Sequence, residues 1–145
     1  GRGDRKQECG REARLMAGFL SADWLAELAV GASGLADRPG VAGSVRFVVT
    51  GTPLGRVEFL LVVADGRVVD LVPGRAGDAD ATVTWKYPEA VSWFRGDLDP
   101  DVAYMTGRCK VEGDYAAFVF GLRLVFGSRD WSGMLADLAE RTDFG

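Results

Sequence analysis

The sequence predicts one α+β domain, a mostly antiparallel sheet of five strands with helices packed on one face. Apolar and polar residues alternate in short strands, turn residues separate these strands, and helical apolar stripes flank the strand region at both ends. A length of 145 residues suits a single domain. Because residues 1–14 are charged throughout, we expect them to be a disordered tail and residues 15–145 to be the domain.

The predicted domain begins with helical segments. Residues 15–20 carry apolar side chains at helical spacing, which predicts a first helical turn. Ser21 fits the N-cap of a second helix, because its hydroxyl can accept from a free backbone N–H, and residues 24–28 continue the apolar stripe. The glycine-rich stretch 31–43 then connects the helical region to the strands.

Five strands follow. The second is apolar apart from Glu58, as expected for a strand with neighbours on both sides. Asp65-Gly66 supplies the positive φ angles of a tight hairpin after it. The charged alternate residues of the last strand predict a solvent-facing surface. The predicted strands cover residues 45–50, 57–63, 67–72, 81–86 and 108–112.

Two short helices separate the last two strands. Pro88 fits the first position of one helix, and Gly96 ends it. Asp99 caps the other, which Pro100 opens. The final helix follows Ser128, with Trp131, Met134, Leu135 and Leu138 at i, i+3, i+4 and i+7.

The predicted helix 115–126 is apolar on two sides. Phe118 and Leu122 share one stripe, whereas Phe120 and Leu124 lie opposite, where a surface helix should be polar. One side can pack on the sheet, and the other needs another helix, a partner subunit or a ligand. We therefore predict a cavity between the sheet and this helix, closed by the helix of Trp131.

Composition excludes several function classes. The net charge of −4, with acids and bases mixed along the chain, excludes a nucleic-acid binder of the usual basic kind. The longest apolar run, Phe59 to Ala64, is too short to span a bilayer, so no stable membrane insertion is expected. The chain contains no asparagine or isoleucine, which suggests a GC-rich bacterial genome. Two separated cysteines, Cys9 and Cys109, favour a reduced, cytoplasmic protein.

The absence of histidine limits the available chemistry. Ser-His-Asp and Cys-His catalysis and His-ligated zinc all require it, and no phosphate-binding or dinucleotide-binding glycine motif is present. We therefore expect no metal, no cofactor and no enzymatic activity. Cys109 is interpreted as an inert thiol, and Glu58 as the ion-pair partner of Arg46 or Arg67 and not as a general base. Arg123 could meet a carboxylate headgroup, although a salt bridge at the surface is favoured.

Four motifs together resemble the sterol carrier protein 2 superfamily, as in a bacterial stand-alone member. The resemblance covers about residues 41–126 and implies an apolar tunnel between sheet and helices for sterols, fatty acids or acyl-CoA. Heavy aromatic content near the presumed tunnel sets this chain apart from the better-known carriers. The motifs are the Asp65-Gly66 hairpin, the segment Asp78 to Trp85, the turn Gly96 to Pro100, and Gly107 to Asp114 with its Val-Glu-Gly-Asp ending.

The sequence thus predicts non-catalytic binding of an apolar or lipid-like ligand, as carrier or sensor. Two alternatives stay open: an interaction module that forms a homodimer without ligand, and a small lipid-modifying enzyme that uses Glu58 or a tyrosine. The partner expected is an apolar small molecule or lipid. The predicted ligand-binding residues are Trp93, Phe94, Met105, Phe118, Phe120, Leu122, Leu124, Trp131, Met134 and Leu135.

Overall fold

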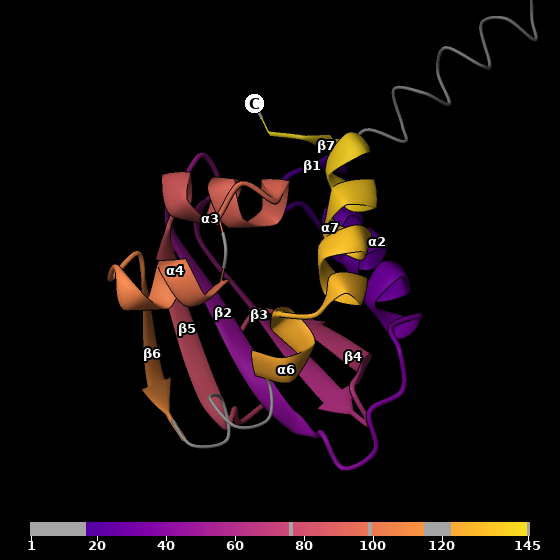
Figure 1. Cartoon of the computed structure of the whole chain (residues 1–145). Helices are drawn as coiled ribbons and strands as arrows, with labels where there is room; N and C mark the ends of the chain where they lie inside the picture. Colours follow the sequence, from indigo (N-terminus) through magenta and orange to yellow (C-terminus); the bar gives the residue numbers. More distant parts are fainter. Residues whose placement is uncertain (1–16, 76, 99, 115–122, 145) are drawn as a thin grey trace, which may run out of the picture.

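A five-stranded sheet forms the centre of the computed structural model, which describes residues 17–75, 77–98, 100–114 and 123–144 (Figure 1). The strand order is β4-β3-β2-β5-β6; β2 and β5 run parallel and the other neighbours antiparallel. This confirms the predicted mostly antiparallel sheet. The strands are β2 (Gly43–Thr52), β3 (Gly55–Ala64), β4 (Arg67–Pro73), β5 (Ala81–Lys86) and β6 (Cys109–Gly113).

The helices gather on one face of this sheet, as predicted (Figure 1). Ser21 and Ser128 are N-caps whose hydroxyls accept from the backbone N–H groups of Trp24 and Trp131. Pro88 is the second residue of its helix, one position later than predicted, and Gly96 ends that helix with a φ of 91°. The helices are α2 (Ala22–Ser33), α3 (Tyr87–Arg95), α4 (Pro100–Met105), α6 (Arg123–Phe126) and α7 (Arg129–Glu140).

The two ends of the described chain pair with each other. Ala17–Gly18 forms β1, which lies parallel to β7 (Thr142–Asp143). The prediction of a helical turn over residues 15–20 is therefore wrong for 17–20, and Leu20 has a φ of 68°. Phe19 and Leu20 are nevertheless buried. The apolar spacing of this segment therefore indicates contact with the core and not a helix.

The connection from β4 to β5 crosses the sheet face opposite the helices. It passes from one edge of the sheet to the far side of β2, and on the way the Gly77 carbonyl accepts a hydrogen bond from Arg46. Leu60 is buried under this connection, since a Cβ on Gly77 would lie 3.2 Å from its Cδ2. The crossing explains why β3 is apolar on both faces.

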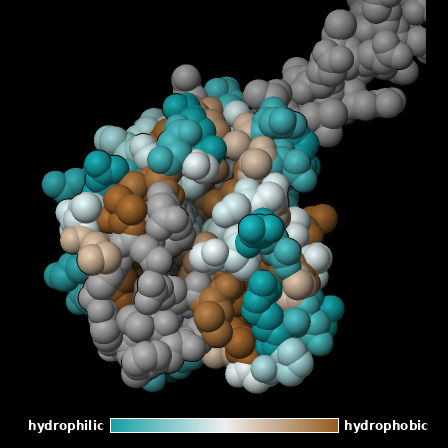
Figure 2. Space-filling model, viewed as in Figure 1, coloured by the Kyte–Doolittle hydropathy of each residue, from teal (hydrophilic) through white to brown (hydrophobic). Residues whose placement is uncertain are grey.

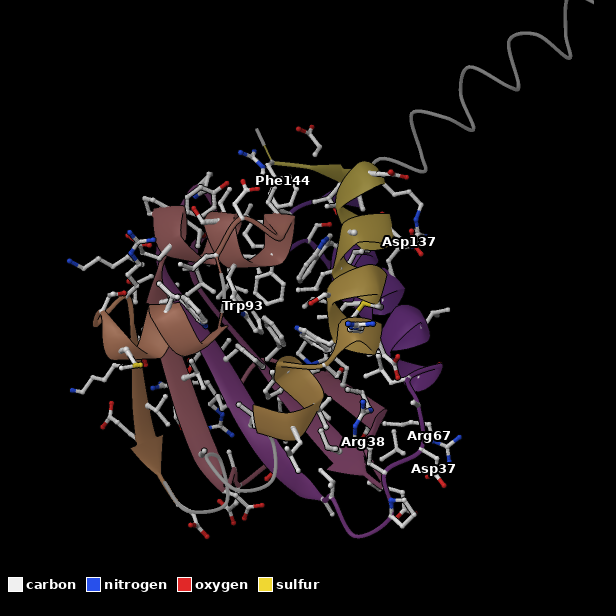
Figure 3. All side chains as sticks on the ribbon, in the orientation of Figure 1. Asp37, Arg38, Arg67, Trp93, Asp137 and Phe144 are labelled. Carbon is white, nitrogen blue, oxygen red and sulfur yellow. The ribbon has the colours of Figure 1, made fainter. Side chains whose placement is uncertain are left out.

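Glu58 lies on the same covered face. Its carboxylate forms ion pairs with Arg75, at 2.9 Å, and with Arg56, at 3.6 Å. Arg67 pairs instead with Asp37, at 3.9 Å (Figure 3). The predicted pairing of Glu58 with Arg46 or Arg67 is thus corrected: the partners come from its own strand and from the crossing connection, whose path no strand pattern predicts.

Candidate functional site

Aromatic rings fill the described space between the sheet and the helices. Neighbouring ring centroids lie between 4.7 and 6.3 Å apart, and most of the pairs meet edge to face or tilted. Figure 3 shows Trp93 near the middle of this layer, on the sheet-facing side of α3. The rings that are at least nine-tenths buried are Phe19, Trp24, Phe47, Phe59, Trp85, Trp93, Phe94, Phe126 and Trp131.

Three of these rings form a column, which we call the tryptophan column: Trp85 on β5, Trp93 on α3 and Trp131 on α7. The centroid of Trp93 lies 5.2 Å from that of Trp85, with the rings stacked, and 5.7 Å from that of Trp131. The two outer indoles have buried Nε1–H donors, and no hydrogen-bond partner for them lies in the part of the chain that the structure describes. An indole N–H normally finds a partner when buried, so the column departs from ordinary core packing.

A groove opens beside the column, between the end of α3, α6 and the first half of α7. Its volume is about 400 Å³. The surface is hollowed between α3 and α7 in Figure 2. Arg95, Asp97 and Ser132 supply polar atoms to this groove. The apolar walls are formed by Trp93, Leu98, Phe126, Trp131, Leu135 and Ala136.

Three of the predicted ligand-binding residues, Trp93, Trp131 and Leu135, line this groove. Phe94 is buried behind them in the ring layer. The structure places Met105 on α4 and Leu124 on α6 at the surface, 82% and 56% exposed. The remaining predicted residues fall elsewhere: Met134 lines a second groove between α2 and α7, while Phe118, Phe120 and Leu122 lie outside the described residues.

Two large apolar residues of the groove escaped the prediction. Phe126 ends the predicted helix 115–126 but was not assigned to the site, and Leu98 lies between two short helices. Leu98 is only 6% exposed although it belongs to a connection. An apolar residue isolated among Gly96, Asp97 and the following acids is a signal that could have identified it, because loops seldom bury such a side chain without a reason.

The second groove, between α2 and α7, is polar. Its volume is about 350 Å³, and Asp130, Asp137 and Arg141 line it. Arg141 also forms an ion pair with Glu27 of α2, and Arg38 lies 3.6 Å from Asp130. These charges hold the two helices together and make this groove unsuited to an apolar ligand.

The thiol beside the tryptophan column is a poor nucleophile. Cys109, the register partner of Trp85 across β5 and β6, is half-buried, and burial raises the pKa of its thiol to about 11. A nucleophilic cysteine needs the opposite shift. Within the described ranges, no three His, Cys, Asp or Glu side chains group together as metal ligands would. Nor does the described part of the chain contain a helix long and apolar enough to cross a membrane.

Residues 27–118 match the model of the SCP-2 sterol transfer family. The chain belongs to this family. The match spans the sheet, α3, α4 and most of α2, and membership supports binding or transfer of a lipid or sterol. Among curated proteins, none matches the chain significantly.

Solved structures share the fold of this SCP-2 family member. A crystal structure of sterol carrier protein 2 has a TM-score of 0.63 at 15% identity, covering 84% of this chain and 98% of that one. A protein from Thermus thermophilus, described as possibly a sterol carrier protein, scores 0.59 at 16% identity, covering 86% and 95%. Palmitated SCP2L2 from Aedes aegypti scores 0.58 at 19% identity, covering 74% and 96%.

Proposed function

We propose that this protein binds a lipid-like molecule in the groove between α3, α6 and α7, as a non-catalytic carrier or sensor. The observation that carries the proposal is the groove itself. Its volume of about 400 Å³ falls in the range of small-molecule sites, and apolar and aromatic side chains form about half of its surface. The sterol transfer family and the palmitated relative support a sterol or an acyl chain as the ligand class.

The expected affinity is moderate. Burial of an acyl chain contributes about 0.8 kcal/mol per methylene before losses. Ordering of the chain and of the wall side chains offsets much of this gain, so a dissociation constant in the micromolar range is expected. The free thiol of Cys109 fits a reduced compartment, and we propose a cytoplasmic location on that basis.

A charge placed in the groove tests the proposal. Ala136 lines the groove from the exposed side of α7, so Ala136→Glu should leave the core intact and put a carboxylate where the chain of the ligand would lie. Gly133→Glu is the matched control, since it adds the same charge to the same helix at a position with open space around it. Binding is measured by fluorescence titration with Nile red, a neutral apolar probe.

We expect Ala136→Glu to weaken probe binding at least tenfold, because an ionised group against apolar walls costs several kcal/mol unless it is paired. Gly133→Glu should bind as wild type does. Circular dichroism should show equal folding in all three proteins. Equal binding by both variants, or no probe uptake by wild type, would show that this groove is not a lipid site.

Exposed apolar side chains favour a second candidate, a dimerisation module. Met105 on α4 and Leu124 on α6 are large, and each is more than half exposed. Such side chains can mark an interface when they are contiguous. Sedimentation velocity across a hundredfold concentration range distinguishes the candidates: a dimer that dissociates in Leu124→Glu supports the module, and a monomer throughout removes it.

A further inference from the structure

The buried indole donors of the tryptophan column indicate what kind of ligand the groove selects. The Nε1–H groups of Trp85 and Trp131 have no hydrogen-bond partner among the described residues, although both side chains are at most 2% exposed. Trp24 is buried to the same extent, and its Nε1–H donates to the Thr142 hydroxyl at 3.1 Å. The absence of a partner is therefore a property of the column, and not of every buried tryptophan in this fold.

Each unpaired donor destabilises the unliganded protein. A buried N–H without a partner has lost its hydrogen bond to water and gained none in return, and an oxygen atom supplied from outside would remove this cost. Trp131 also lines the groove, and Trp93, whose ring lies between the two donors, lines it as well. A ligand entering the groove is therefore adjacent to Trp131 and to Trp93, the ring neighbour of Trp85.

Both N–H groups are fully covered, so a ligand oxygen reaches them only if a ring moves. Trp93 is the ring that both outer indoles share as a neighbour, with centroids 5.2 Å from Trp85 and 5.7 Å from Trp131, so we take it as the ring that moves. Displacing it toward the groove moves it over apolar walls and breaks no hydrogen bond recorded among the described side chains.

The charges of the groove decide between a neutral and an ionised oxygen. Arg95 is the cation that lines it, but the side chain lies over the ring of Phe144, 4.9 Å from the centroid, near the end of the chain and away from the column (Figure 3). Asp97 adds a negative charge to the same rim. Among the described residues, a carboxylate carried into the column would thus have no cation beside it, and burying an unpaired carboxylate is far more costly than burying a carbonyl or hydroxyl oxygen.

We propose that the tryptophan column makes this site selective for a neutral apolar molecule that carries one hydrogen-bond-accepting oxygen, over the ionised acid of the same length. The inference rests on the proposed function, since it assumes that the groove takes up an apolar ligand. The accepting atom is a carbonyl, ester or hydroxyl oxygen, bound by the N–H of Trp131 and, once Trp93 has moved, by that of Trp85.

The test compares three ten-carbon ligands, 2-decanone, decane and decanoate, as competitors of a neutral fluorescent probe such as Nile red at pH 7. Wild type should bind the ketone more tightly than decanoate. Trp131→Phe keeps an aromatic ring and removes the donor, so the ketone should lose about three- to tenfold in affinity while decane changes less than twofold. Trp24→Phe is the matched control and should alter both ligands equally.

Nuclear magnetic resonance supplies a second readout. The chain has four tryptophans, so its indole N–H region holds four side-chain signals, each assignable with a Trp→Phe variant. The ketone should shift the signals of Trp131 and Trp85 and leave that of Trp24 in place. If decane and the probe bind but Trp131→Phe leaves the ketone-to-decane ratio unchanged, this inference is wrong and the proposed function stands. If the probe does not bind at all, both are wrong.

Discussion

Trp24 and Trp131 are both 1% exposed, but they lie in parts of the core that differ in kind. Around Trp24 the packing is complete: its ring meets Phe19 and Phe94 edge to face, and its N–H binds the hydroxyl of Thr142. Around Trp131 a groove adjoins the ring, and no described residue accepts a hydrogen bond from its N–H. One helical layer thus contains a closed region and an open one.

We assign the closed region to stabilising the fold and the open region to the proposed binding of a ligand. The closed region joins β1 and β7 to α2, so the two ends of the described chain are fastened to the core there. The open region joins α3, α6 and α7 to β5 through contacts between aromatic rings, and such contacts can slide without breaking a directional bond. Substitutions in the closed region should therefore lower stability more than binding, and substitutions in the open region should lower binding more than stability.

The largest expected effect is on stability. Trp24→Ala should lower the free energy of unfolding by about 3–5 kcal/mol, because it leaves a cavity in the closed region and removes a buried hydrogen bond. Trp93→Ala should cost at least about 1 kcal/mol less, since its ring borders a groove into which neighbouring side chains can relax. Urea denaturation followed by circular dichroism measures both. Equal losses would mean that the open region is packed as tightly as the closed one.

The next effect concerns Cys109, opposite Trp85 in the sheet. With a pKa raised by burial from 9.0 to about 11, its thiolate fraction near pH 8 should be about a hundredfold below that of an exposed thiol. We expect correspondingly slow alkylation by iodoacetamide, rising tenfold per pH unit up to about pH 10. The measurement uses Cys9→Ser protein, so that one thiol reacts. A rate equal to that of unfolded protein at pH 8 would contradict the burial of this side chain.

The sequence predicts the sheet well because its strands have one dominant pattern. Alternation in residues 45–50 and 81–86 and the hairpin at Asp65-Gly66 require little from distant parts of the chain, and each appears within one to two residues of its expected position. The caps Ser21 and Ser128 are local too. The prediction for residues 17–20 is wrong because the strand at 17–18 forms only by pairing with residues 142–143, more than a hundred positions away.

The site was predicted in part for the same reason. Trp93, Trp131 and Leu135 lie on helix faces whose direction the 3.6-residue period sets, and they reach the groove. Met105 has the same kind of spacing but lies at the surface, because a helix of six residues does not set which side faces inward. Leu124 is exposed as well. No sequence pattern distinguishes the paired indole of Trp24 from the unpaired ones, since the partner, Thr142, comes from the other end of the chain.

The smallest effect tests the cost of an unpaired indole donor directly. Thr142 is 5% exposed, accepts from Trp24 Nε1 and donates to the Leu138 carbonyl at 2.6 Å. Thr142→Val keeps the shape and leaves the Trp24 donor in the condition of Trp131, so we expect a loss of about 1–2 kcal/mol in urea denaturation.

Thr84→Val, on the sheet face away from the helices, is the control, because its hydroxyl has no hydrogen bond among the described residues; it should change stability by less than about 0.5 kcal/mol. If Thr142→Val lowers the free energy of unfolding no more than Thr84→Val does, an unpaired indole N–H destabilises this core little. A ligand oxygen would then gain little affinity by binding the donors of the column. If the loss is as expected, the donors of Trp85 and Trp131 carry a comparable cost in the unliganded protein, and a ligand that removes it gains affinity by doing so.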